Sequence, residues 1–305
     1  MMVRKVIEVK NLVKRYGDIL ALSGVSFEVY RGETFALVGP NGAGKTTTVE
    51  ILECLRIPTS GEARVLGMDV TEQAEEIKRR IGVLPQEFST FERLTVEENV
   101  SLIAKIYNRE DNVRRILETF GLWDVRKRMF GSLSGGMKRR VGVAMALVSE
   151  PEIVFLDEPT TGLDPQARQD LWQVIRELRR KATTVFLTTH YMEEVEALAD
   201  RASLILSGRI LVTDSVSKLI SRYGGGFRIN TRGRKAAQLL RKLGGEVVSQ
   251  NGEVTAVFKS QGEALEALLI LRKSGIEARM IEPSMNEVFL NLAGGRINER
   301  GEMVP

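Results

Sequence analysis

The sequence predicts an α/β fold with a mixed sheet in its core, followed by a small α+β domain. Continuous apolar runs at residues 34–38, 153–156 and 184–187 are typical of buried strands in a parallel sheet, and helix-compatible segments lie between them. The run Gly224-Gly225-Gly226 is a candidate linker, and a separate order of strands and helices begins beyond it. These observations predict two domains, at residues 1–222 and 227–293, as the length of 305 residues allows.

Each element of the first domain is predicted from its own pattern. Residues 6–13 and 25–30 alternate between apolar and polar positions, as half-buried strands do. The other strands are predicted from short apolar runs, at residues 34–38, 81–84, 153–156, 184–187, 202–206 and 209–212, the last two forming a hairpin around Ser207-Gly208. Helices are predicted at residues 46–55, within 95–123 and at 165–180, where Pro165 occupies a first-turn position. A helical subdomain is expected at about residues 87–149.

The second domain is predicted to have the order βαββαβ, followed by one more helix, which fits a small ferredoxin-like domain. The elements are expected at residues 227–231, 235–243, 246–258, 263–273, 278–281 and 286–292, with Asn251-Gly252 as a type I′ turn in the hairpin. The apolar face of the last helix suits either docking on another surface or the domain's own core. Residues 294–305 are polar, and we expect a disordered tail there.

Charge gives only weak information about partners. The net charge of +4 is small, and the charges are interspersed along the chain. The basic runs Arg126-Lys127-Arg128 and Lys138-Arg139-Arg140 are short, and we interpret them as solvated helix faces rather than as nucleic-acid patches. We therefore expect no direct nucleic-acid partner.

Cysteine usage and hydropathy bear on where the protein works. Cys54 is the only cysteine, so an intrachain disulfide is impossible and a reducing, cytosolic compartment is expected. No signal peptide is visible at the start of the chain. The longest apolar run, residues 141–148, is too short to span a bilayer. Work at a membrane would therefore require another chain to supply the spanning helices.

The segment after the strand at residues 34–38 fits the phosphate-binding pattern G-x-x-x-x-G-K-[ST] without a departure. It consists of Gly39, Pro40, Asn41, Gly42, Ala43, Gly44, Lys45 and Thr46, and Thr47 follows. Glycines let backbone N–H groups turn toward phosphate oxygens, and the N-terminus of the next helix adds partial positive charge. Lys45 can then reach the β- and γ-phosphates, and the Thr46 hydroxyl can bind Mg²⁺. A plain glycine-rich turn is the weaker interpretation, because the match is long and lies between a strand and a helix.

Two carboxylates follow the apolar strand at residues 153–156. In a site that hydrolyses a nucleotide, Asp157 would hold Mg²⁺, usually through water. Glu158 would act as general base or orient the attacking water. The alternative is an acidic cap at a strand end beside Pro159, which is the weaker interpretation after a phosphate loop at this distance.

A second candidate anion site lies at Leu133-Ser134-Gly135-Gly136-Met137, which opens a helix. Ser134 suits the N-cap, and Gly135 and Gly136 have no side chains that would cover the backbone N–H groups at the helix N-terminus. One nucleotide does not need two phosphate-binding helix ends from the same subunit. We therefore expect this end to meet the γ-phosphate held by another copy.

Taken together, these segments resemble the ATP-binding cassette (ABC) ATPases, the nucleotide-binding subunits of ABC transporters. The matching segments are residues 39–47 (Walker A), 133–137 (the signature L-S-G-G-Q, with Met137 in place of glutamine), 153–158 (Walker B) and 162–165 (the D-loop). The matching single residues are Gln86 (glutamine loop), His190 (switch histidine) and Tyr16 (the aromatic residue that stacks on adenine). The resemblance covers about residues 3–218, with seven elements in the family's order.

The resemblance implies an ABC-type P-loop ATPase that hydrolyses ATP with Mg²⁺. Catalytic roles are implied for Lys45, Gln86, Glu158 and His190, and metal contacts for Thr46, Gln86 and Asp157. The implied partners are a second cassette ATPase, paired head to tail as a homodimer, and an integral-membrane permease. The protein would then work at the cytoplasmic face of the cell membrane.

Within the family, Ser-Gly-Gly-Met followed by basic residues is similar to the drug-resistance type of exporter ATPase, as is the stretch at residues 282–290. One alternative is a soluble cassette ATPase that acts on ribosomes or nucleic acid, but those relatives usually fuse two cassettes or carry long insertions. Another is a regulatory module that holds ATP without turnover. The presence of both Asp157 and Glu158 disfavours that alternative.

Overall fold

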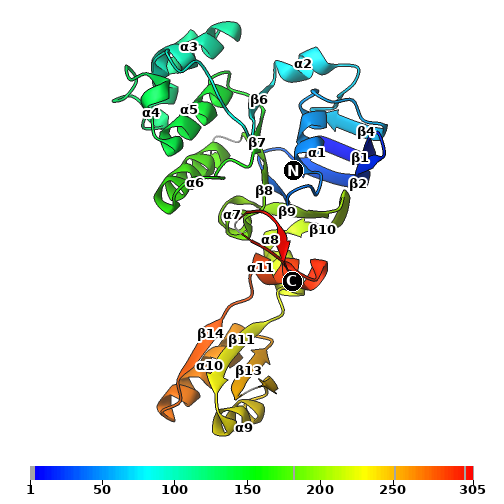
Figure 1. The fold of residues 1–305 in the computed structure, drawn as a ribbon, viewed down its shortest axis with the longest axis vertical. Helices are drawn as coiled ribbons and strands as arrows, with labels where there is room; N and C mark the ends of the chain where they lie inside the picture. Colours follow the sequence, from blue (N-terminus) through cyan, green and yellow to red (C-terminus); the bar gives the residue numbers. More distant parts are fainter. Residues whose placement is uncertain (1–3, 181–182, 251, 299, 305) are drawn as a thin grey trace. The chain divides into compact units, whose positions relative to one another are not determined.

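The computed structural model describes residues 4–180, 183–250, 252–298 and 300–304, and the chain divides into two compact units (Figure 1). The first unit runs to Asp214 and also contains Ile297–Met303, and the second runs from Ser215 to Arg296. This division differs from the predicted boundaries, because residues 215–222 join the second unit. A disordered tail was predicted at residues 294–305, but residues 297–303 belong to the first compact unit.

A six-stranded sheet forms the centre of the first unit. Its spatial order is β10 (Arg209–Ser215), β9 (Arg201–Leu206), β3 (Thr34–Val38), β8 (Thr184–Thr189), β7 (Ile153–Asp157) and β6 (Ile81–Leu84). The strands from β9 to β6 pair in parallel, and every residue of β3, β7 and β8 is buried, as their apolar runs predicted. Since parallel strands end at the same edge, the segments that follow β3, β6, β7 and β8 meet there.

A second, antiparallel sheet packs against the first through a shared core. Its order is β2 (Ile19–Tyr30), β1 (Lys5–Tyr16), β4 (Ser60–Val65) and β5 (Met68–Asp69). In the core, the ring of Phe35 stacks on that of Phe27 with centroids 5.4 Å apart, and on that of Phe186 at 5.6 Å. The two sheets together form the predicted mixed β core.

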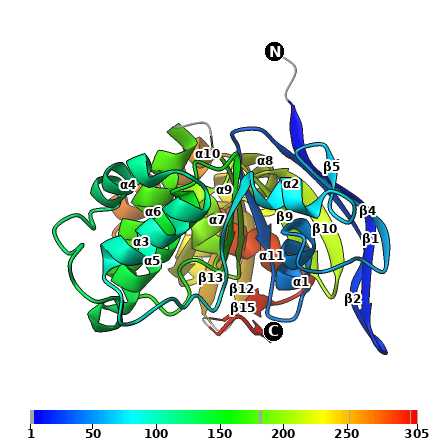
Figure 2. The same cartoon turned by 90° about the horizontal axis from the view of Figure 1, so that it is seen from above.

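The helices of the first unit surround these sheets. They are α1 (Lys45–Leu52), α2 (Ala74–Lys78), α3 (Val96–Ile106), α4 (Val113–Thr119), α5 (Gly135–Leu147), α6 (Pro165–Arg180) and α7 (Met192–Leu198), with 3₁₀ turns η1 (Glu110–Asn112) and η2 (Phe130–Ser132). Helices α3, α4 and α5 gather on the side of the central sheet opposite the antiparallel sheet (Figure 2), and they correspond to the predicted helical subdomain. Across the ranges that the structure describes, no helix is long and apolar enough to cross a membrane.

The second unit contains a four-stranded antiparallel sheet in the predicted βαββαβ order. Its spatial order is β12 (Glu246–Gln250), β13 (Glu253–Phe258), β11 (Phe227–Arg232) and β14 (Ala278–Ile281). Helices α9 (Arg234–Lys242) and α10 (Gln261–Lys273) share a core with these strands, in which Leu240 and Leu271 meet Ile229 and Phe258. The predicted turn residue Asn251 lies outside the described residues.

A pair of helices completes the second unit. Helix α8 (Val216–Tyr223) packs on α11 (Met285–Ala293), in which Val288 and Phe289 are almost fully buried. The apolar face of α11 is therefore interior rather than a free docking surface.

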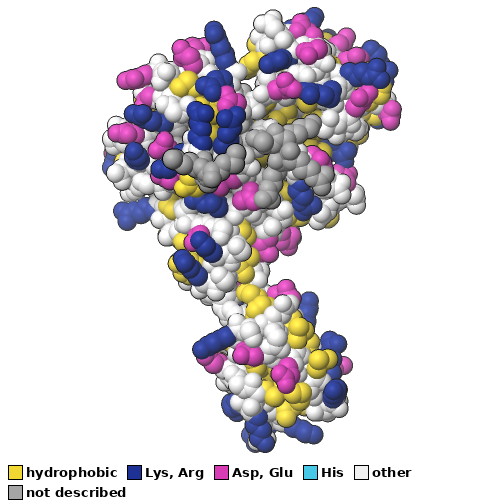
Figure 3. Space-filling model, turned by 180° about the vertical axis from the view of Figure 1, so that it is seen from behind, with side chains coloured by type: hydrophobic (Ala, Val, Ile, Leu, Met, Phe, Trp, Pro, Cys, Tyr) yellow, Lys and Arg dark blue, Asp and Glu magenta, His cyan; other side chains and the backbone are white. Residues whose placement is uncertain are grey.

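Near the C-terminus, β15 (Arg296–Ile297) pairs with β16 (Met303–Val304). On the face shown in Figure 3, basic and acidic side chains are interspersed, as they are in the sequence.

Candidate functional site

The phosphate loop joins β3 to α1 at the edge where the parallel strands end. Two of its glycines are required by the local geometry. A Cβ on Gly39 would lie 2.1 Å from the carbonyl oxygen of Ile205, and Gly44, the N-cap of α1, has a φ of 104°. The tight loop places backbone N–H groups next to a helix N-terminus, which is the arrangement that binds phosphate in proteins.

Three side chains from distant parts of the sequence meet beside this loop, and all three are buried. Lys45 donates to two carbonyl oxygens of the loop, at 2.8 and 3.1 Å, and its Nζ lies 3.1 Å from Oε1 of Glu158. The other carboxylate oxygen of Glu158, Oε2, lies 3.1 Å from Nδ1 of His190. The structure thus brings together a cation, a carboxylate and an imidazole that the sequence analysis had assigned to one site.

The pKa values of the two carboxyl groups at this edge, Asp157 and Glu158, are shifted in opposite directions. Burial opposes ionisation of Glu158, but its hydrogen bond with His190 and the ammonium of Lys45 outweigh burial and lower its pKa to about 2. Burial dominates at Asp157 and raises its pKa, although the hydroxyls of Thr188 and Thr46 stabilise the carboxylate. Glu158 is therefore ionised over the whole physiological range of pH.

The residues present fit a nucleotide phosphate and Mg²⁺. Nε2 of His190 is buried and has no hydrogen-bond partner among the described residues. With a proton on both ring nitrogens, His190 would donate from Nδ1 to Glu158 and from Nε2 to a phosphate oxygen. Thr46 and Asp157 are in hydrogen-bond contact, and such oxygen donors suit Mg²⁺. The described residues include no cluster of three or more His, Cys, Asp or Glu side chains that could hold a metal alone. This donor set fits a cation that also binds substrate phosphates.

A cavity of about 260 Å³ lies over these groups. Its lining combines the phosphate loop with Gln86, which follows β6, and Glu158, which follows β7. The lining residues are Ala21, Asn41, Gly42, Gly44, Lys45, Thr46, Thr47, Gln86 and Glu158. The cavity therefore unites eight of the predicted site residues, which come from the phosphate loop and from the segments after β6 and β7.

Nine of the predicted site residues are not among the described residues that line this cavity: Tyr16, Gly39, Pro40, Ala43, Ser134, Gly135, Gly136, Asp157 and His190. Tyr16 ends β1, is 39% exposed, and has the ammonium of Lys14 5.0 Å from its ring centroid. Ser134 caps α5, where its hydroxyl accepts a hydrogen bond from the Met137 N–H at 3.4 Å. The N-terminus of α5 is exposed and belongs to a separate place on the surface.

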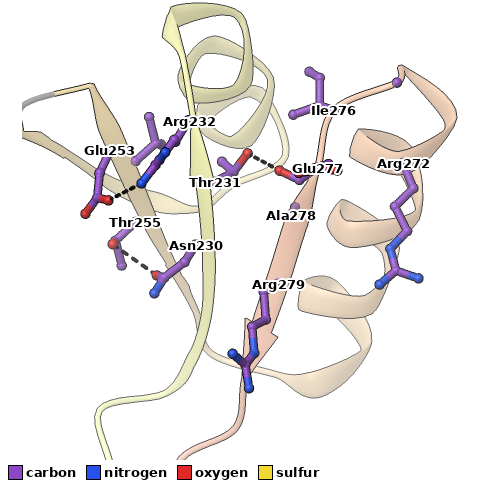
Figure 4. A pocket seen from close by; sticks show the side chains of 12 residues that line it. Asn230, Thr231, Arg232, Glu253, Thr255, Arg272, Ile276, Glu277, Ala278 and Arg279 are labelled. Carbon is purple, nitrogen blue, oxygen red and sulfur yellow. Dashed lines mark hydrogen bonds and ion pairs between the residues drawn. The ribbon is translucent and has the colours of Figure 1, made fainter.

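A larger groove, of about 1020 Å³, lies in the second unit and holds none of the predicted site residues (Figure 4). Arg232 and Glu253 form an ion pair of 3.0 Å there, but their side chains are 82% and 69% exposed. Buried titratable groups with shifted pKa values gather instead around Lys45 and Glu158. Those groups, rather than cavity size, identify the candidate site.

The phosphate loop also contacts a turn near the C-terminus. The backbone N–H of Asn41 donates to the carbonyl of Gly301 at 2.6 Å, and its side-chain amide donates to the carbonyl of Arg300 at 2.8 Å. Asn298 closes this turn, because its side-chain oxygen accepts from the N–H of Glu302 at 3.0 Å. In this structure the backbone N–H of Asn41, one of the donors of the phosphate loop, is therefore hydrogen-bonded to the turn.

Two residues around the site were not predicted. The hydroxyl of Thr188, on β8, donates to Asp157 and accepts from the N–H of Glu158. Arg139 was interpreted as part of a solvated face, but it is only 9% exposed, and that interpretation is wrong for this residue. Residues 141–147 of the same helix are all buried, so this part of the helix turns little of its surface toward solvent. The apolar run that begins two residues after Arg139, at Val141, was the available signal.

Glu53, at the end of α1, gives a pH-dependent prediction. Its side chain is 5% exposed, and burial, with repulsion from Asp157, raises its pKa from 4.5 to about 8. Between these values the folded protein keeps a proton that the unfolded chain loses, so stability falls as pH rises. We expect Glu53→Gln to raise the free energy of unfolding by about 1–3 kcal/mol more at pH 8 than at pH 5. Urea unfolding of wild type and Glu53→Gln at pH 5 and at pH 8 measures this difference. An equal change in the free energy of unfolding at the two pH values would contradict the prediction.

Comparison with known proteins agrees with this geometry. The sequence profile of the ABC transporter family matches residues 22–161. The daunorubicin resistance ATP-binding protein DrrA3 of Streptomyces coeruleorubidus is 39% identical over 303 residues, covering 94% of this chain and 96% of that protein. The Nod factor export ATP-binding protein I of Burkholderia lata is 37% identical over 300 residues, covering 96% of this chain and 98% of that protein.

Solved structures of ATP-binding cassettes share the fold. The ADP conformation of a cassette from an ABC transporter is 26% identical, with a TM-score of 0.65, covering 70% of this chain and 92% of that one. A dimeric, post-hydrolysis cassette bound to ADP and Pi is 28% identical, with a TM-score of 0.62, covering 68% and 98%. These likenesses confirm the predicted ABC-type fold. The chain therefore belongs to the ABC transporter family, as a nucleotide-binding ATPase that hydrolyses ATP.

Proposed function

We propose that this chain is the ATPase subunit of an exporter and drives a separate integral-membrane permease from the cytoplasmic face of the cell membrane. The observation that carries the chemistry is the buried group of Lys45, Glu158 and His190 beside the phosphate loop. The export role is supported by relatives whose names refer to daunorubicin resistance and Nod factor export. The cargo would be a drug-like or other small molecule, recognised by the permease.

Each residue has a separate task in the proposed reaction. Lys45 and the N–H groups of the phosphate loop bind the β- and γ-phosphates, and His190 contacts the γ-phosphate through its unpartnered Nε2. Thr46 and Asp157, with Gln86, would hold Mg²⁺, which neutralises phosphate charge when bound. Glu158 orients the attacking water and accepts its proton.

The ion pair between Lys45 and Glu158 has a further role in this scheme. A carboxylate with a pKa of about 2 is a weak base. When Lys45 turns to a phosphate, Glu158 loses one of the cations that lower its pKa, and its basicity rises. Substrate binding would therefore strengthen the base at the moment it is needed.

We also propose a head-to-tail homodimer with two shared sites. Ser134, Gly135 and Gly136 lie outside the cavity lining of their own chain, and they present a capped helix N-terminus that suits a phosphate. In the dimer they would complete the partner's site, while Tyr16 would stack on the adenine of its own. A dimeric arrangement among solved cassettes supports this.

The test of the export role combines two measurements. Phosphate release by the purified chain measures hydrolysis, and affinity purification from detergent-solubilised membranes identifies the co-purifying chain. Retention on membranes only when a permease is co-expressed is the expected result. Co-purification with ribosomes or nucleic acid instead would favour a soluble ATPase.

Ending the chain at Asp214 gives a prediction about the second unit. Every residue that lines the nucleotide cavity precedes this point, and the compact units divide there. The truncation also removes Gly301 from Asn41, which frees a loop donor. We expect the Kd for ATP to rise by no more than about threefold, a change below 1 kcal/mol. Dimer association, measured by sedimentation with ATP, and binding to membranes should weaken more than ATP affinity does. A large loss of ATP affinity with unchanged dimer association would contradict this division of tasks.

A further inference from the structure

The side chain of Arg139 lies beneath the nucleotide site without lining its cavity. It extends from the second turn of α5 and is 9% exposed. A guanidinium carries five N–H donors in a fixed plane, and here each of them meets a backbone carbonyl oxygen. Nε donates to Pro159 (2.8 Å), Nη1 to Pro85 (3.1 Å) and Gln86 (3.0 Å), and Nη2 to Asp157 (2.8 Å) and Glu158 (2.9 Å).

The five carbonyls belong to two loops that carry predicted catalytic side chains. One loop follows β6 and presents Gln86 to the cavity, and the other follows β7 and presents Glu158. A planar fork that bonds to both loops at once fixes the distance between them. A lysine has three donors on one compact ammonium and cannot reproduce this pattern of five bonds.

The backbone at Glu158 shows why such a fixture is needed. Its φ is 45°, a left-handed conformation that residues other than glycine rarely adopt. On one side the N–H of Glu158 donates to the carbonyl and hydroxyl oxygens of Thr188, at 3.2 and 3.0 Å. On the other side the carbonyl accepts from Arg139. The unfavourable conformation, which directs the carboxylate to Lys45 and His190, is therefore held from both ends.

We infer that Arg139 is a positioning residue for ATP hydrolysis: its guanidinium holds the Glu158 carboxylate and the Gln86 segment in place for the reaction. Without the fork, the peptide at Glu158 can relax to an ordinary conformation and carry the carboxylate away from the attacking water. Nucleotide binding depends on the phosphate loop, whereas the five hydrogen bonds of Arg139 go to the two other loops. This inference rests on the proposed role of Glu158 as the base.

The test uses the full-length chain with Arg139→Lys, which keeps the charge but loses the fork, and Arg139→Gln, which avoids burying an unmatched ammonium. Arg140→Lys is the matched control, because Arg140 pairs with Asp170 and not with the two loops. Folding is checked by ATP titration and circular dichroism. We expect both Arg139 variants to lower kcat by about 10- to 100-fold, the usual effect of a small misplacement of a reacting group. KM should stay within about threefold, because ground-state binding is retained.

A second measurement separates positioning from a general loss of stability. In the Glu158→Gln background, Arg139→Lys should lower the residual kcat by less than about twofold, because residues that act as a unit are not additive. A kcat within twofold of wild type for a folded Arg139 variant, a rise in KM alone, or an undiminished loss in the Glu158→Gln background would overturn the inference. If wild type hydrolyses ATP and Glu158→Gln does not lower the rate, the assignment of the base fails instead. The two failures are thereby distinguished.

Discussion

Glu158→Gln is expected to leave ATP binding intact and to lower hydrolysis by about 10²–10⁴-fold, the usual contribution of a general base. The side chain keeps its size, so its contacts with Lys45, His190 and Thr161 can be retained as hydrogen bonds. An amide cannot accept the proton of the attacking water. The proposed dimer would still close around ATP but would no longer hydrolyse it, so an ATP-bound dimer should accumulate.

Phosphate release, ATP titration and sedimentation with ATP measure these three effects. Glu193→Gln is the matched control, because Glu193 lies on the exposed side of α7, three residues from the buried His190. The control should hydrolyse ATP at the wild-type rate and dissociate after turnover. Near-normal hydrolysis by Glu158→Gln would remove Glu158 from the proposed role, whatever the oligomeric state.

The centre of this site was predictable because parallel strands impose a simple rule. Lys45, Glu158 and His190 are far apart in the sequence, but each follows a strand of the central sheet. The ends of β3, β7 and β8 share one edge, so the three side chains meet. The glycines of the phosphate loop were predictable for a different reason, since local backbone geometry already requires them.

Other features depend on contacts that no local pattern encodes. The burial of Arg139 follows from carbonyls of two loops that lie more than fifteen residues away in the chain. The boundary after Asp214 was missed because α8 packs on α11, near the other end of the second unit. The contact of Asn41 with Gly301 joins opposite ends of the sequence, and a polar tail gives no sign of it. In each case, tertiary packing decides where a residue of ordinary local character lies.

Ser134→Arg is expected to abolish most hydrolysis while ATP binding to the monomer survives. The exposed N-terminus of α5 is separate from the cavity that binds nucleotide in the same chain. In the proposed dimer a bulky cation there would clash where the partner's γ-phosphate meets Ser134. Losing the N-cap alone costs only about 0.5–2 kcal/mol of stability, so Ser134→Ala measures that part separately. Loss of ATP binding by the Ser134→Arg monomer would argue against a shared site.

Mixing two inactive variants gives the sharper form of this prediction. In a head-to-tail dimer of Lys45→Ala with Ser134→Arg, one site would combine the defective phosphate loop of the first chain with the blocked helix end of the second. The other site would combine the intact phosphate loop of the Ser134→Arg chain with the intact Ser134 of its partner. We therefore expect phosphate release to reappear on mixing, although each variant alone is inactive. If Ser134 instead served the nucleotide of its own chain, every site in the mixture would retain a defect, and no activity would return.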